Sequence, residues 1–243
     1  MDTKKIQAKL NELGYDAGPV DGDAGGRTIK AILHFQEDYN LLQDGKVGPE
    51  TEKALLAAKP KQDEELKEKR ATAKTSPKDE RWPRQKDCIS FYGPPGGPKA
   101  TAGTVHLVAP MRIAWDKGQR ISSFKCHEKV AAAMTTIFAE TVAHYGEDKW
   151  RELGLDLFGG CYNLRAMRGG TAYSMHSWGI AVDIDPERNQ LKWSRNAVPG
   201  RRPAAQMAKA GYEAFWNIVE SAGATSLGRV RDFDWMHFQF ASL

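Results

Sequence analysis

The sequence has few cysteines, and the three that it contains are widely separated. Cys88, Cys126 and Cys161 are an odd number with no close spacing, which provides neither a disulfide framework nor a paired thiolate metal site. We therefore expect free thiols in a reducing compartment. Long apolar runs are missing as well, because no segment approaches the roughly 20 consecutive apolar residues that a membrane span needs. The sequence predicts no stable membrane insertion.

The N-terminus lacks the apolar stretch of a secretion signal. Its first 16 residues, MDTKKIQAKLNELGYD, mix charged and apolar side chains in the pattern of an amphipathic helix. This favours a protein that is made in the cytoplasm without a signal peptide.

An excess of one charge is also missing. Lys and Arg number 35 and Asp and Glu 31, which gives a net charge of +4 without a basic stripe, so we expect no nucleic-acid partner. Apolar residues make up 41% of the chain, enough for a core. The 243 residues exceed one average domain, and we expect one small and one larger unit.

The boundary between the two units is visible in the composition. Residues 59–84 read KPKQDEELKEKRATAKTSPKDERWPR, with dense mixed charge and only Leu66 and Trp82 as large apolar side chains. Such a composition is typical of a linker, here with a short solvent-exposed helix over residues 63–73. We therefore predict three parts: an N-terminal domain at 1–60, a charged linker at 61–84 and a larger domain at 85–243.

A short repeat organises the N-terminal domain. Segments 21–28 and 44–51 both follow the pattern D-G-x-x-G-x-x-T, and each precedes a helical run of apolar residues. Asp-Gly supplies the positive φ of a tight turn, and Pro49 suits the first position of a helix because no N–H is needed there. With an opening helix that stops at Gly14, the repeat predicts a small all-α domain of three helices.

The wider pattern L-x-x-L-G-Y-x-x-G-x-x-D-G-x-x-G-x-x-T resembles the small peptidoglycan-binding domain that many cell-wall hydrolases carry. The resemblance runs from Ile6 to Ala57 and departs from the family at Gly26, where relatives often have proline. It implies that this domain binds peptidoglycan. The matching residues are Leu10, Gly14, Tyr15, Gly18, Asp21, Gly22, Gly25, Thr28, Phe35, Gln36, Leu41, Asp44, Gly45, Gly48 and Thr51.

The larger domain mixes helices and strands without a regular alternation. Residues 130–145 and 204–222 show helical apolar spacing, whereas 179–184 and 236–240 read as short strands. This order favours an α+β domain with a small antiparallel sheet over a doubly wound α/β fold.

Two of the six histidines stand in a chemically suggestive context. His176 precedes the run Ile180–Asp185, in which alternation places Ala181, Asp183 and Asp185 on one strand face. A fully extended chain would separate His176 from Asp183 by about 23 Å at ~3.3 Å per residue. A shared metal ion therefore requires a turn, and Gly179 can provide it. His34, His106, His127 and His144 have no acidic or histidine neighbour at ligand spacing.

The second context is the segment 232–240, DFDWMHFQF. Its histidine, His237, opens an apolar/polar strand, and the carboxylate of Asp234 lies three residues earlier. These residues provide a third metal ligand and a general base, although a buried histidine in an edge strand fits the same pattern.

Together, S-x-H-x-x-G-x-A-x-D and D-x-x-H-F resemble the zinc D,D-carboxypeptidase and L-alanyl-D-glutamate endopeptidase family, from about Tyr162 to the C-terminus. The resemblance implies one Zn²⁺ per chain, held by His176, Asp183 and His237, with Asp234 as the general base. Two imidazoles and one carboxylate leave an open position for water, as in catalytic zinc sites.

Four nearby residues have open roles. Arg165 matches the family stretch that supplies a cation for the oxyanion, and Arg168 is the alternative. Ser174 either holds the substrate or shapes the turn. We expect Cys161 to be a bystander, because a thiolate ligand would fill the open position.

The resemblances predict a phage endolysin-like zinc peptidase that cuts peptidoglycan stem peptides between L-Ala and D-Glu, as a monomer. Asp234 favours this choice, because phage endopeptidases tend to have aspartate there and D-Ala-D-Ala enzymes glutamate. A D-alanyl-D-alanine carboxypeptidase and a non-catalytic wall-binding protein are the alternatives. We expect synthesis in the host cytoplasm and release to the wall through a holin-type pore.

Overall fold

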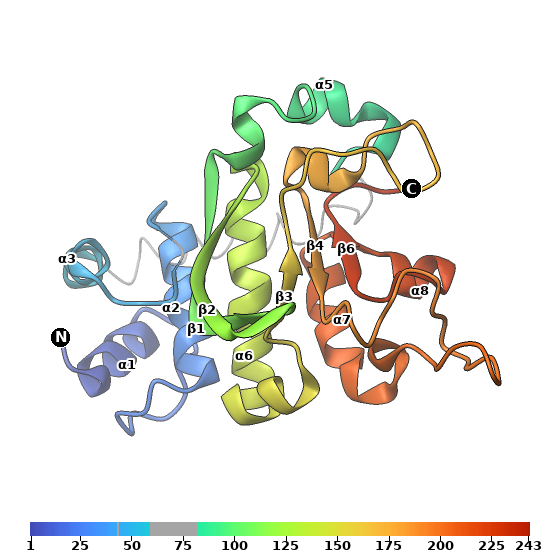
Figure 1. Ribbon diagram of the computed structural model, residues 1–243. Coiled ribbons are helices and arrows are strands. Elements are labelled where there is room, and N and C mark those ends of the chain that lie inside the picture. The colour runs from blue at the N-terminus through green and yellow to red at the C-terminus, as the bar shows by residue number, and fades with distance from the viewer. Residues whose placement is uncertain (43, 59–81) are drawn as a thin grey trace.

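A computed structural model of the protein describes residues 1–42, 44–58 and 82–243 (Figure 1). The exposed helix expected over residues 63–73 and most of the expected linker lie outside the described residues. In the part of the chain that is described, no helix is both long and apolar enough to cross a membrane.

Three helices form the N-terminal region, as the sequence predicts. The Asp2 carboxylate caps the first of them by accepting a hydrogen bond from the Lys5 N–H at 2.9 Å. The inward faces of the helices form a core of their own, with Leu10, Phe35 and Leu55 fully buried. The helices are α1 (Thr3–Glu12), α2 (Gly26–Asp38) and α3 (Pro49–Ala57).

Two buried glutamines hold the repeated turns in the same way. Gln7 on α1 donates from Nε2 to the Asp21 carboxylate at 2.8 Å and accepts the N–H of the following glycine at 2.8 Å. Gln36 on α2 makes the same two bonds one repeat later, to the Asp44 carboxylate at 2.8 Å and from the next glycine at 3.0 Å. Each carboxamide also reaches the threonine that ends its turn. The sequence repeat is thus a repeat of turns that a buried side chain locks.

A six-stranded sheet organises the larger part of the chain. Its order is β2-β1-β3-β4-β6-β5, and every neighbouring pair is antiparallel except β1 with β3. The α+β class is confirmed, with one parallel pairing that the sequence did not predict. The strands are β1 (Gly103–Ile113), β2 (Asp116–Cys126), β3 (Leu157–Gly160), β4 (Ala181–Ile184), β5 (Thr225–Ser226) and β6 (His237–Gln239).

The hairpin of β1 and β2 is absent from the sequence-based expectations. Every second side chain of β1 is buried from Val105 to Ile113, which is the alternation of a strand with one face in the core. β2 is mostly exposed and buries only Phe124 and Cys126. An edge strand of this kind shows little apolar alternation in its sequence.

Helix α6 (Ala131–Leu153) packs against β1 and against α7 (Glu213–Ser221) (Figure 1). The helix expected over residues 130–145 is longer in the structure: it continues to Leu153, through a kink at Gly146 where φ is 71°. Two shorter helices complete the domain, α5 (Cys88–Tyr92) and α8 (Leu227–Arg231).

The helix expected over residues 204–222 is only partly present, as α7. The residues before α7 form short 3₁₀ turns instead, Gln206–Ala208 and Ala210–Tyr212. The Asn189 carboxamide accepts the Met207 N–H at 2.7 Å, which removes that N–H from a continuous helical ladder. The hydrogen bond from Asn189, 18 residues earlier in the chain, thus prevents the continuous helix that the apolar spacing predicts.

The last residues of the expected linker pack against the larger domain. The Trp82 indole donates to the Ala222 carbonyl at 3.1 Å, and its ring lies 5.0 Å from that of Phe240. Arg84 forms a bridge with Ser242 near the C-terminus. Residues 82–84 are therefore part of the folded domain rather than solvated linker.

We predict that Gln36→Ala destabilises the N-terminal domain. The substitution leaves the buried N–H of Gly45 without its acceptor, and an unsatisfied buried group costs about 1–3 kcal/mol. Hydrogen exchange measured by mass spectrometry should show faster exchange across α1 to α3. The exposed neighbour Glu37 provides the control, since Glu37→Ala should leave exchange unchanged; equal exchange in both variants would contradict the prediction.

Candidate metal centre

Strands β4 and β6 carry two of the expected ligands. They pair in antiparallel register with Asp183 directly opposite His237, so that both side chains share one face of the sheet. His176 lies on the 3₁₀ helix Met175–Trp178, and Gly179 follows with a φ of 64°. A Cβ at Gly179 would lie 2.1 Å from the Ala100 carbonyl oxygen. The turn that the sequence requires is therefore present and needs glycine for two reasons.

The three expected ligands converge. One donor atom from each of His176, Asp183 and His237 lies within 4.8 Å of the others. Asp183 Oδ1 is 3.3 Å from His176 Nε2 and 2.9 Å from His237 Nδ1. Both imidazoles are buried, with 4% and 6% of their surface exposed. In the described part of the chain no other group of histidine, cysteine and acidic side chains has this arrangement.

Hydrogen bonds on the far side of His176 fix its tautomer. Its Nδ1 lies 2.6 Å from the Cys161 carbonyl oxygen, which can only accept. Nδ1 therefore carries the proton, and Nε2 presents a lone pair toward Asp183.

His237 is held in the opposite tautomer. The Gln239 carboxamide donates from Nε2 to the Ala241 carbonyl at 2.8 Å, which orients its Oε1 toward His237 Nε2 at 3.2 Å. His237 Nε2 therefore carries the proton, and the lone pair of Nδ1 faces Asp183. Gln239 is buried and lies opposite the small side chain of Ala181.

This donor set fits a zinc ion. Two imidazole lone pairs and one carboxylate oxygen face each other, so a positive charge is needed between them. Without an ion between the donors, protons on the facing nitrogens of His176 and His237 take its place: burial raises the pKa of the Asp183 carboxyl, but hydrogen bonds and charge from the protonated imidazoles lower it below its usual value and keep the carboxylate ionised. Burial also opposes a charge on His237, whereas Asp183 raises its pKa overall. His176, Asp183 and His237 would hold the ion.

Asp234 lies beside the three donors. Its carboxylate is 8% exposed, and Oδ1 has no hydrogen-bond partner among the described residues. Burial raises the pKa of this carboxyl to about 6, with the charges of His237 and Asp183 acting on it in opposite directions. Its backbone has a φ of 55°, and its carbonyl accepts the His237 N–H at 3.0 Å. A buried carboxyl with such a pKa suits proton transfer near neutral pH.

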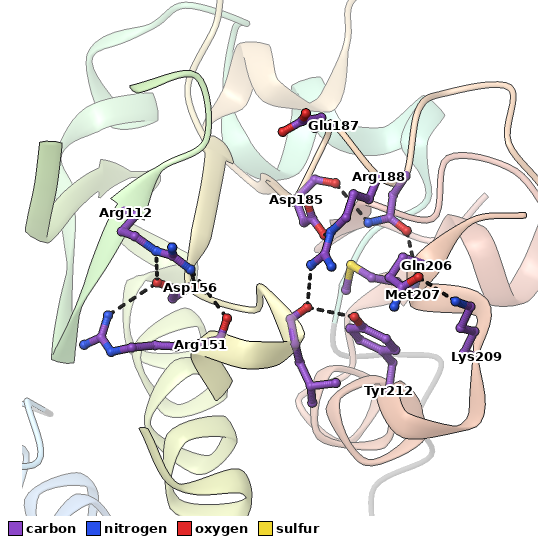
Figure 2. Close-up of polar contacts among 12 residues, drawn as sticks. Arg112, Arg151, Asp156, Asp185, Glu187, Arg188, Gln206, Met207, Lys209 and Tyr212 are labelled. Atoms are coloured by element: carbon purple, nitrogen blue, oxygen red, sulfur yellow. Dashed lines mark hydrogen bonds and ion pairs between the residues drawn. The ribbon is translucent and has the colours of Figure 1, made fainter. Parts of the chain in front are cut away.

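Asp185 does not join the site, although strand alternation places it on the face of Asp183. It follows the last residue of β4 with a φ of 50°, so that the alternation ends before it. Figure 2 shows its side chain paired with Arg188, at 2.6 Å. Arg188 also donates to the Leu153 carbonyl. Asp185 therefore anchors the loop behind the sheet.

A second ion pair in Figure 2 supports the same part of the sheet. Asp156 is fully buried and binds Arg112 of β1 through both carboxylate oxygens, at 2.6 and 2.7 Å. Arg151 of α6 approaches the same carboxylate at 3.4 Å. This cluster joins α6 to β1 at the edge where β3 begins.

The two candidate arginines differ in position. The backbone of Arg165 is fixed by the Ser177 hydroxyl, and its guanidinium bonds only the Ala166 carbonyl, at 3.3 Å, among the described residues. Arg168 is exposed, and its charge lowers the pKa of Asp234. The structure thus brings the charge of Arg168 to bear on the proposed base, whereas it shows no contact of Arg165 with the donors.

Ser174 and Cys161 have structural contacts. The Ser174 N–H donates to the Arg165 carbonyl, and its own carbonyl accepts the Ser177 N–H, which shapes the turn before His176. Burial raises the pKa of the Cys161 thiol well above its usual value, so the sulfur stays protonated while the carbonyl oxygen orients His176.

His127, one of the histidines without ligand spacing, is buried, and its Nε2 lies 3.0 Å from the Tyr92 carbonyl oxygen.

Gln239 is the residue of the site that the sequence reading missed. Its signal is a polar side chain two positions after His237, on the same face of a strand whose neighbours are apolar. The contact of the Cys161 carbonyl with His176 could not be predicted from the sequence, because every residue type has a backbone carbonyl.

The fold and the donor set define a two-part protein: a module of three helices and an α+β domain that carries a candidate metal centre. Comparison with known families agrees. Residues 2–55 match the family described as peptidoglycan binding domain, and residues 168–240 match the family described as D-alanyl-D-alanine carboxypeptidase. Two separate regions of the chain are thus similar to these two families.

Characterised relatives are similar over short stretches. The N-acetylmuramoyl-L-alanine amidase CwlM of Mycobacterium tuberculosis is 43% identical over 54 residues, which is 22% of this chain and 13% of the relative. The spore cortex-lytic enzyme of Bacillus cereus is 37% identical over 57 residues, 24% of this chain and 22% of the relative. The chain thus matches less than a quarter of either relative's length. No solved structure matches it.

We predict one zinc ion per chain, and its loss in His176→Ala, Asp183→Ala or His237→Ala. Each residue supplies one of three protein bonds. Gln239→Leu should retain the site but lower zinc affinity by about 10–100-fold, because it removes the partner that orients His237. Competition with a chelator, together with elemental analysis, measures both effects. Gln239→Glu keeps an acceptor and serves as the control; stoichiometric zinc in His176→Ala would contradict the ligand assignment.

Proposed function

We propose that the protein is a zinc-dependent peptidase that hydrolyses peptidoglycan stem peptides, cutting between L-Ala and D-Glu, while its N-terminal domain binds the wall. The observation that carries the proposal is the convergence of His176, Asp183 and His237 beside the buried carboxyl of Asp234. The match of separate regions to a wall-binding family and a peptidase family supports the substrate.

The chemistry follows from the residues around the donors. When bound, zinc would polarise the scissile carbonyl and lower the pKa of water at its open position. Asp234 takes the proton of the attacking water and delivers it to the departing amine. Its pKa of about 6, raised by burial, allows both steps near neutral pH. The charge of Arg168, or that of the half-buried Arg165, stabilises the oxyanion.

The choice of bond rests on Asp234 and on the resemblance to phage endopeptidases, which tend to have aspartate at this position. A D-alanyl-D-alanine carboxypeptidase is the alternative, and the description of the matching family favours it. A non-catalytic wall-binding protein is less well supported, because all three donors and the base are present. We further propose a phage endolysin that accumulates in the host cytoplasm and reaches the wall through a separate pore.

Digestion of purified sacculi distinguishes these functions. An L-alanyl-D-glutamate endopeptidase creates new N-terminal D-Glu residues, whereas a carboxypeptidase releases free D-Ala, and mass spectrometry identifies each product. We expect new D-Glu termini that disappear when zinc is removed by a chelator. Release of D-Ala alone would favour the alternative, and no new terminus at all would contradict a peptidase.

We predict that Asp234→Asn folds and keeps zinc while it loses activity. Asparagine tolerates the positive φ of this position, and loss of a general base costs on the order of 10²–10⁴-fold in turnover. Asp234→Glu should keep partial activity, because displacement near 1 Å can cost ~10²-fold. Zinc content and turnover are measured on the same preparation.

Asp232 is the matched control, since it also has a positive φ but is paired with Arg195 and lies outside the donor set. Asp232→Asn should leave turnover nearly unchanged. Zinc lost in proportion to activity in Asp234→Asn would instead make Asp234 an orienting group for His237.

A further inference from the structure

Helix α2 has apolar side chains on two faces. Ile32 and Phe35 belong to the core of the three-helix domain. Leu33 points elsewhere: it is only 2% exposed, although it is not part of that core. Leu33 is therefore buried on a second face of α2, outside the core of the three-helix domain.

The larger domain packs against α2. α2 packs against α6 and lies beside it and β1 in Figure 1. The turn after α2 also approaches β1, because a Cβ at Gly45 would lie 3.0 Å from the Val108 side chain. The same Cβ would lie 3.2 Å from Ile29 and 3.7 Å from Leu33. Apolar side chains of both domains thus meet at this turn.

A charged contact borders the apolar one. Glu140 of α6 forms an ion pair with Lys30, with 3.3 Å between Oε1 and Nζ. His34 Nε2 lies 3.9 Å from the same carboxylate oxygen. Lys30 and His34 are one helical turn apart on α2, on the side that carries Leu33. The Glu140 side chain is 20% exposed, so water screens this contact less than a surface ion pair. Lys30 and His34, which lie near one carboxylate oxygen, specify the register of α2 on α6.

We propose that this contact, here called the docking interface, holds the wall-binding domain and the peptidase domain as one rigid unit and so orients the active site on the wall. This inference rests on the proposed function of both domains. The docking interface consists of Ile29, Lys30, Leu33 and His34 of α2, with Val108 of β1 and Glu140 of α6.

A rigid unit acts differently from a tethered one. A flexible tether raises the local concentration of the enzyme at the wall. A docked anchor also limits the orientations in which the active site meets the stem peptides, which supplies part of the positioning that hydrolysis needs. The docking interface lies on α6 and β1, whereas the zinc donors lie on β4, β6 and the 3₁₀ helix. Opening it should therefore leave the chemistry on small peptides intact.

The test uses full-length Glu140→Lys, which turns attraction into repulsion toward Lys30. Small-angle X-ray scattering should give a radius of gyration near ~18 Å for the compact wild type and a value several ångströms larger for Glu140→Lys. Hydrolysis of sacculi should fall severalfold, whereas hydrolysis of a soluble stem peptide should not change. Glu152→Lys makes the same charge change on α6 away from α2 and is the control.

Charge exchange makes the test specific. Glu140→Lys combined with Lys30→Glu should restore both the compact radius and the rate on sacculi, and Leu33→Asn should open the unit without any change in charge. An extended wild type, or a Glu140→Lys protein as compact as wild type, would overturn the docking. Expansion without a change in the rate on sacculi would overturn the orienting role. Scattering does not depend on catalysis, so a wild type that cleaves nothing would refute only the proposed function.

Discussion

The antiparallel pairing of β4 with β6 places Asp183 opposite His237, and the rest of the candidate site depends on this register. A shift of one residue would turn one of the two side chains to the other face of the sheet. The third donor reaches them only because Gly179 reverses the chain against the Ala100 carbonyl. The ion pair of Arg112 with the buried Asp156 supports β1 and β3, next to β4, where β3 begins.

The hydrogen bonds behind the donors decide what kind of site this is. A carbonyl and a carboxamide, from Cys161 and Gln239, leave the lone pairs of two histidines directed at one carboxylate. Such a cluster is unfavourable without a cation or added protons, and this supports the proposal of a metal centre over a pair of buried structural histidines. Asp234 then stands beside it as a buried carboxyl that is not needed to complete the donor set.

The N-terminal domain uses one device twice, a buried glutamine that locks a turn. Gln7 and Gln36 satisfy the hydrogen bonds of their turns within the domain. The outer faces of the helices are therefore not needed for these turns and can contact other parts of the protein. The face of α2 with Leu33 meets the peptidase domain, and in our proposal it carries the orientation of the anchor. The repeat thus accounts for the stability of the module and the docking interface for its placement.

Residue types and short spacings in the sequence were sufficient for the three helices and the α+β class, because helix period and turn chemistry are local. The set His176, Asp183 and His237 came from the resemblance of two short motifs to a known family. The tertiary structure alone decided the contacts of Asp185, Leu33 and Gln239. Alternation placed Asp185 with Asp183 until a positive φ ended the strand, and periodicity could not say which of two domains covers Leu33. These outcomes depend on partners many residues away along the chain, which a local pattern does not contain.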